Sequence, residues 1–228
     1  MLIVIPCGGL ATRLGKLAEN KPKAMMNIDG KPFLEHQINL IKKYDFDELV
    51  LCIGHLGEQI QEYFGDGNEF GITIKYSKDN GLDVIGAIKN AEPLLRDNFI
   101  MMYGDSYLPA VDFNELYEKF LNQEKPAMMT VWKNQNKIDP SNIKVENNEV
   151  VGVKEPDSQH IDYGAIALNK KTLRHVPENT TFSTAAFWKK LAEHHELATY
   201  EIYERYYDIG SEERLNEVKT LVGGKIYA

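Results

Sequence analysis

Apolar residues in the first 105 positions follow two alternating periods. Continuous or alternating apolar runs predict β-strands, and the continuous ones are typical of strands covered on both faces. Between these runs, apolar residues recur at helical spacing. Strands alternating with helices in this way predict a parallel sheet between helix layers, with ligands at the carboxyl ends of the strands. The strands are expected at residues 2–5, 48–54, 72–76 and 99–103, and the helices at 32–44, 55–64 and 84–95.

Beyond residue 110 the pattern changes. Strands become more frequent, and the pair Asn147-Asn148 predicts the turn of a hairpin over 143–153. A last helix is expected from Ser211, a residue type that caps helix N-termini. We therefore predict one α/β domain over 1–228, with a Rossmann-like mixed, mostly parallel sheet flanked by helices. The remaining strands are expected at 127–132, 161–168, 197–203 and 207–209, and helices at 112–122 and 182–194.

Composition places the chain among ordinary globular proteins. Its 228 residues are 43% apolar and 26% charged, with a formal net charge of −8. An acidic chain without a long basic face argues against a nucleic-acid partner. Without a run long enough to span a membrane, and with a strand in place of a signal peptide, we expect no membrane partner and a cytoplasmic location. Cys7 and Cys52 lie beside apolar runs and are expected to be buried thiols.

Candidate chemistry begins where the first strand ends. Cys7-Gly8-Gly9 lets the backbone turn tightly, and the N–H groups freed in such a turn form an anion site. Thr12, Arg13 and Lys23 add a hydroxyl, a guanidinium and an ammonium. These groups suit a polyphosphate. The segment is also a basic island in an acidic chain, which favours a local anionic ligand over a loop that merely solvates the strand.

This loop matches neither of the two common glycine-rich phosphate-binding motifs. It resembles the G-G-x-x-T-R-L … P-K signature of the sugar-1-phosphate nucleotidyltransferases, matched here by Gly8-Gly9-Leu10-Ala11-Thr12-Arg13-Leu14 and Pro22-Lys23. The resemblance implies that Cys7, Gly8, Gly9 and Thr12 bind the nucleotide. It also implies that Arg13 grips the β- and γ-phosphates, and that Lys23 neutralises the reacting α-phosphate. Lys23 alone would be read as a solvated surface lysine.

Two acidic residues are candidates for a metal site. Gly104-Asp105 follows a buried strand directly, opposite the first loop, and a carboxylate there is well placed to hold Mg²⁺ with phosphate oxygens. A lone aspartate in this position is more often a turn former or cap. The second acid lies in Tyr207-Asp208-Ile209-Gly210. Both match the family pattern, and the resemblance implies that Asp105 and Asp208 bind the catalytic Mg²⁺.

Two further segments resemble family elements but depart from them. Leu82 to Ala87 keeps the last Gly-Ala of the nucleobase-binding L-G-T-x-G-A and loses its Gly-Thr. Gly86 still allows close approach to a base or ribose, and Asp83 either accepts hydrogen bonds from them or caps the helix. Lys154-Glu155-Pro156 exchanges the first two residues of the sugar-contacting E-K-P, which leaves open which side chain faces the sugar. The other residues expected at the sugar are Tyr103, Gly104 and Gly164.

The resemblance implies a Mg²⁺-dependent enzyme with a nucleotidyltransferase (GT-A-like) fold, whose partners are a nucleoside triphosphate and a sugar-1-phosphate. Residues 1–110 would form the nucleotide-binding half and 111–228 the sugar-phosphate half. Three segments resemble those of heptose-1-phosphate guanylyltransferases: Gly104-Asp105-Ser106-Tyr107-Leu108-Pro109, Ser141-Asn142 and Lys31-Pro32-Phe33-Leu34-Glu35. This likeness favours an activated sugar such as GDP-heptose, made for surface glycan. The alternatives are a cytidylyltransferase acting on a non-sugar phosphate such as phosphocholine and a non-catalytic nucleotide-sugar-binding regulator. The base, the sugar and the formation of a homo-oligomer stay open.

Overall fold

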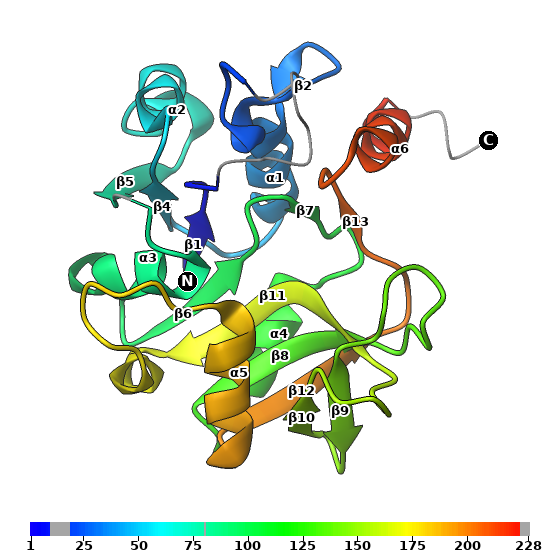
Figure 1. Cartoon of the computed structure of the whole chain (residues 1–228). Helices are drawn as coiled ribbons and strands as arrows, with labels where there is room; N and C mark the ends of the chain where they lie inside the picture. Colours follow the sequence, from blue (N-terminus) through cyan, green and yellow to red (C-terminus); the bar gives the residue numbers. More distant parts are fainter. Residues whose placement is uncertain (10–18, 80, 224–228) are drawn as a thin grey trace.

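The computed structural model describes residues 1–9, 19–79 and 81–223. Its main feature is a nine-stranded sheet in the order β5-β4-β1-β6-β11-β8-β12-β10-β9 (Figure 1). In that order the strands are β5 (Thr73–Lys78), β4 (Glu48–Ile53), β1 (Leu2–Pro6), β6 (Asn98–Met102), β11 (Ile161–Asn169), β8 (Ala127–Trp132), β12 (Leu197–Ile202), β10 (Glu149–Val153) and β9 (Ile143–Glu146). Only β10 and β11 run against the others, which confirms the predicted mixed, mostly parallel sheet.

Helices cover both faces of this sheet. α1 (Phe33–Ile41), α2 (Gly57–Phe64) and α4 (Phe113–Leu121) contribute to the core on one face. α3 (Val84–Asn90) and α5 (Thr184–Glu193) contribute to the core on the other. The continuous apolar runs serve both cores because successive side chains of a strand point to opposite faces. In β1, Ile3 and Ile5 join the first core while Leu2 and Val4 join the second.

The last helix, α6 (Glu212–Val222), lies beside the sheet rather than on it (Figure 1). It packs on a small third core with Phe33 and Ile209. Two short strand pairs lie nearby: β2 (Asn27–Ile28) with β3 (Lys31–Pro32), and β7 (Ser106–Tyr107) with β13 (Tyr207–Asp208). None of the described helices has the length and apolar character needed to cross a membrane.

Local sequence accounts for several element ends. Asp112, Ser183 and Ser211 each cap the helix that follows with a side-chain oxygen. Asn147 and Asn148 both have positive φ, as the turn of the predicted hairpin requires. The helix expected over 84–95 was predicted too long: α3 ends at Asn90, and a 3₁₀ turn follows over Glu92–Leu94. Pro93 explains the break, because proline removes a helical hydrogen bond and clashes with the preceding turn.

Candidate active site

The carboxyl ends of β1, β4 and β6 meet at one edge of the sheet. Gly104, directly after β6, has no room for a side chain, since a Cβ there would lie 2.2 Å from the Pro6 carbonyl oxygen. This close approach holds Asp105 beside the end of β1. Gln37 of α1 donates to the carbonyl oxygens of Tyr103 and Ser106, at 3.0 and 2.7 Å, and so clamps the turn that carries Asp105.

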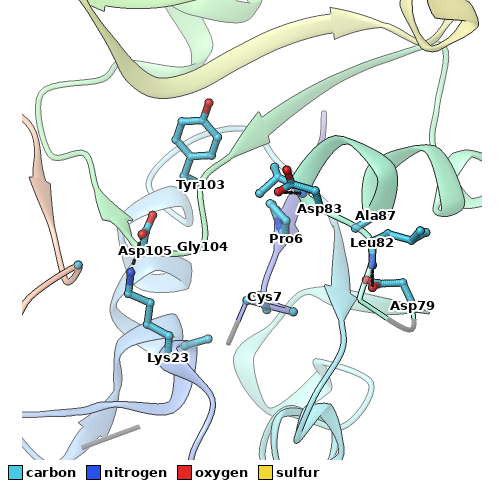
Figure 2. A pocket seen from close by; sticks show the side chains of 15 residues that line it. Pro6, Cys7, Lys23, Asp79, Leu82, Asp83, Ala87, Tyr103, Gly104 and Asp105 are labelled. Atoms are coloured by element: carbon cyan, nitrogen blue, oxygen red, sulfur yellow. Dashed lines mark hydrogen bonds and ion pairs between the residues drawn. The ribbon is translucent and has the colours of Figure 1, made fainter. Parts of the chain in front are cut away.

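Lys23 and Asp105 meet at this edge. Lys23 begins the 3₁₀ turn Lys23–Met25, and its Nζ lies 2.6 Å from Asp105 Oδ2. Their side chains are 15% and 35% exposed, so the pair is open to a ligand on one side only. Figure 2 shows the pair on one side of Cys7, with Asp79 and Leu82 on the other. Thr12 and Arg13 lie outside the described residues.

A cavity of about 260 Å³ opens above this pair. Its walls come from the first loop, from the segment between β5 and α3, and from the turn after β6. Of the predicted nucleotide-binding residues it contains Cys7, Gly8, Gly9 and Asp83. The Cys7 thiol is buried, and burial raises its pKa to about 12, so the residue is a neutral wall of the cavity. The full lining is Pro6, Cys7, Gly8, Gly9, Lys23, Ala24, Asp79, Leu82, Asp83, Val84, Ala87, Tyr103, Gly104, Asp105 and Gly210.

Two residues near the start of α3, Asp83 and Gly86, were both expected at the nucleotide, but only Asp83 lines the cavity. Asp83 lines the cavity and also caps α3, accepting from the Val84 amide at 2.8 Å. Gly86 is not part of the cavity wall. A Cβ at Gly86 would lie 2.6 Å from the Thr180 carbonyl oxygen, so this glycine serves close packing against residues 180–182.

Asp79 is a site residue that the sequence analysis missed. It is buried, and its Oδ1 accepts from the amides of Gly81 and Leu82 at 2.8 and 2.9 Å. Its Oδ2 has no hydrogen-bond partner among the described residues. A buried carboxylate oxygen in a cavity wall without a donor is costly unless a ligand supplies one.

A second cavity, of about 350 Å³, adjoins the first. Tyr103 and Asp105 line both, so the two spaces meet at the turn after β6. Lys154 faces the second cavity, while Glu155 lies against Gly152. The exchange of residue types in this segment therefore turns the lysine toward the cavity. Gly164 is not part of the wall but packs behind it, with positive φ and a Cβ position 3.1 Å from Ser106 Oγ.

The polar centre of the second cavity is Asp162, also missed from sequence. Its Oδ2 accepts from the Tyr103 hydroxyl at 2.6 Å and from Trp188 Nε1 at 3.1 Å, and its Oδ1 accepts from the Gly164 amide. Burial raises the pKa of Asp162 to about 6, although these three hydrogen bonds lower it. The same burial, with the nearby Asp162 charge, raises the pKa of Tyr103.

Asp208, near the C-terminal end of the chain, also lines the second cavity. It lies in β13 opposite Ser106, and the next amide, that of Ile209, donates to the Asp105 carbonyl oxygen at 3.0 Å. The Gly210 amide and Arg214 each donate to its carboxylate at 2.6 Å. The fold thus brings Asp105 and Asp208 to the wall of one cavity from positions about a hundred residues apart.

These carboxylates fit Mg²⁺ only in part on their own. No group of three histidine, cysteine or acidic side chains in the described ranges could hold a metal ion. Mg²⁺, however, commonly binds one or two carboxylates and completes its shell with substrate phosphates and water. Asp105 and Asp208 both line the second cavity, and their carboxylates suit that arrangement.

A cavity at the carboxyl ends of parallel strands, lined by a glycine turn, a lysine and Asp105, is typical of nucleotide-binding α/β proteins. Residues 3–205 match the family described as MobA-like NTP transferase domain, and the chain belongs to that family. The resemblance to sugar-1-phosphate nucleotidyltransferases is likewise confirmed by its relatives.

Among curated relatives, the chain is 38% identical over 127 residues to a Campylobacter jejuni D-glycero-alpha-D-manno-heptose 1-phosphate guanylyltransferase, covering 55% of each chain. It is 29% identical over 144 residues to a Synechocystis UTP–glucose-1-phosphate uridylyltransferase, covering 58% of this chain and 36% of that one. The chain thus spans about a third to about half of the length of these relatives. Among solved structures, HddC from Yersinia pseudotuberculosis in complex with GMP-PN superposes with a TM-score of 0.81. It covers 97% of this chain and 99% of that one at 22% identity, and this likeness supports the fold.

Proposed function

We propose that this chain transfers a nucleoside monophosphate from a nucleoside triphosphate to a sugar-1-phosphate, giving a nucleotide sugar and pyrophosphate. The observation that carries the proposal is the junction of two cavities at Tyr103 and Asp105, with Lys23 on the Asp105 carboxylate. A reaction between two bound phosphates needs two adjoining sites and a positive charge between them. The relatives act on sugar-1-phosphates by name, which supports the same class of acceptor.

The proposed chemistry needs no covalent enzyme intermediate. An acceptor phosphate oxygen attacks the α-phosphorus, the bond to the β-phosphate oxygen breaks, and pyrophosphate leaves in line. Catalysis of this kind rests on positioning and charge neutralisation. Lys23 would leave Asp105 to contact the α-phosphate, while Asp105 and Asp208 would hold Mg²⁺. The metal would supply charge neutralisation at the phosphates.

Pyrophosphate release tests the reaction directly. Each nucleoside triphosphate would be combined with Mg²⁺ and with a panel of sugar-1-phosphates and phosphocholine. Release with a sugar-1-phosphate supports the proposal, and release with phosphocholine alone replaces it with the cytidylyltransferase alternative. No release across the panel, with triphosphate binding retained by calorimetry, would favour the regulatory alternative.

For the nucleotide, we propose guanine. Asp79 Oδ2 is a buried acceptor without a described donor in the wall of the first cavity. Guanine alone among the four bases presents two adjacent N–H donors, N1–H and the N2 amino group, on one edge. Asp79 Oδ2 has two lone pairs for such donors, while Oδ1 stays with the amides of Gly81 and Leu82. The relatives do not agree on the base, since one is a guanylyltransferase and the other a uridylyltransferase.

Asp79→Asn tests this choice, because it keeps the size and the Oδ1 acceptor but replaces Oδ2 with a donor. We expect the ratio of kcat/KM for GTP over UTP to fall by about a hundredfold, as when a base edge loses its matching group. Asp83→Asn is the matched control, since Asp83 lines the same cavity and is engaged in capping α3. An unchanged ratio in Asp79→Asn would remove Asp79 from base selection.

A further inference from the structure

Arg214 lines the second cavity and contacts two carboxylates there. Its Nη1 donates to Asp208 Oδ2 at 2.6 Å, and its Nη2 lies 2.7 Å from both carboxylate oxygens of Asp139. Asp139 belongs to the loop after β8, which joins Arg214 of α6 to a distant part of the chain. Arg214 and Lys154 are the two cations that line this cavity among the described residues.

Asp208 does not depend on Arg214 for its orientation. Its Oδ1 is held by the Gly210 amide at 2.6 Å, and only Oδ2 is taken by the guanidinium. Asp105 is likewise paired through one carboxylate oxygen, because Lys23 Nζ lies against its Oδ2. Each of the two carboxylates expected to bind metal therefore carries one lysine or arginine in the structure.

We infer that Arg214 is the counter-ion that keeps Asp208 paired before substrates bind, and that it then becomes a binding residue for the acceptor phosphate. The inference rests on the proposed function. When a divalent cation takes Asp208 Oδ2, Arg214 loses that partner but remains held at the cavity wall by Asp139. Its Nη1, freed from Asp208, then offers charge-assisted N–H donors to a phosphate oxygen in the cavity, while Nη2 stays on Asp139. Lys23 would move in parallel, from Asp105 to the nucleotide.

Mn²⁺ binding to the protein without nucleotide, measured by electron paramagnetic resonance, tests the first part. Arg214→Met frees Oδ2 while the Gly210 amide keeps Asp208 oriented, so Mn²⁺ should bind about fivefold more tightly, the effect of one lost ion pair. Asp139→Asn removes one of the two carboxylates that pair with Arg214 among the described residues and leaves Asp208, so Mn²⁺ should bind more weakly. A merely structural role would shift both variants in the same direction, and that result would overturn the inference.

Two controls separate this inference from the proposed function. Arg205→Met removes an arginine that pairs with Glu217, outside both cavities, and should leave Mn²⁺ binding unchanged. Asp208→Asn should weaken Mn²⁺ binding. If it does not, Asp208 is no metal ligand and the inference fails, whereas pyrophosphate release by the wild type would still support the nucleotidyltransferase.

Steady-state kinetics test the second part. Arg214→Met should raise the KM for the sugar-1-phosphate by about tenfold, the effect of one charge-assisted contact, with the KM for the triphosphate unchanged. Arg214→Lys should restore part of this loss. An unchanged acceptor KM in Arg214→Met would exclude contact with the acceptor phosphate.

Discussion

The two halves of the candidate active site, named the nucleotide half and the acceptor half after the ligands proposed for them, are built in different ways. The nucleotide half is held by backbone: β1, β4 and β6 end side by side, and Gly104 fits against Pro6 without space for a Cβ. The acceptor half is held by side chains that are far apart in sequence. Tyr103, Asp162 and Trp188 form one such group, and Arg214 with Asp139 and Asp208 forms another.

Because the two halves are built differently, we expect amino-acid substitutions to affect them differently. A site defined by strand ends follows from the fold, so most side-chain substitutions leave its shape intact. A site defined by charged hydrogen bonds depends on a few residues, and replacing one leaves its buried partners unpaired. Acceptor choice is therefore expected to vary more easily than the phosphate-binding geometry.

The largest expected effect is that of Lys23→Ala, at the junction of the two halves. Loss of the single ammonium expected at the α-phosphate should lower kcat by about a hundred- to a thousandfold, as for other donors that act in the transition state. The fold should survive, because Lys23 pairs with Asp105 at the surface of a cavity and not in a core. Single-turnover kinetics would measure the loss of rate, and circular dichroism would show whether the variant is folded. Near-wild-type turnover would remove Lys23 from the mechanism.

The same difference explains what could be predicted from sequence. The strands and helices of the first half follow from apolar periodicity. Lys23 and Asp105 follow from short motifs, P-K for the lysine and G-D after a strand for the aspartate, and their pairing at 2.6 Å brings both motifs to one place. Asp162 lies in a segment where the family resemblance points to Gly164 alone, and Arg214 and Asp139 belong to no local motif. Each of the three acquires its contacts only through partners distant in the chain. Asp79 was missed for another reason: only the structure reveals that one of its buried oxygens has no donor among the described residues.

A second prediction concerns the pH dependence of stability in the acceptor half. Asp162 has a pKa of about 6 in the folded protein, above the value of about 3.9 expected in the unfolded chain. Between these values the folded state binds more protons, so the contribution of Asp162 to the free energy of unfolding falls as pH rises. Above about pH 6 the loss is complete.

Denaturant unfolding of wild type and Asp162→Asn across this range would measure the effect. Other titrating groups cancel in the difference between the two proteins. The wild-type advantage over Asp162→Asn should shrink by about 2 kcal/mol between about pH 4 and about pH 7. A constant difference would mean that Asp162 is ionised in the usual range, and that its hydrogen bonds outweigh its burial.

A third prediction separates the two halves by substrate. Arg13 is expected to contact the β- and γ-phosphates of the triphosphate. Arg13→Ala should therefore raise the KM for the triphosphate about tenfold, the effect of one lost charge-assisted contact. The KM for the sugar-1-phosphate should stay the same. Initial rates with each substrate varied in turn would test this, and a change confined to the sugar KM would reverse the assignment of the two cavities.

The smallest expected effect is that of a substitution in the acceptor half, which should change the KM for the sugar-1-phosphate alone. Trp188→Phe keeps an aromatic ring in the core but removes the Nε1 donor to Asp162, so the KM for the sugar-1-phosphate should rise about threefold, the effect of one neutral donor. The KM for the triphosphate should not change. Trp188 Nε1 also lies 3.3 Å from the Tyr103 hydroxyl, and Tyr103 lines both cavities. An equal rise in both constants would therefore show that Tyr103 couples the two halves, and that the acceptor network also shapes the nucleotide site.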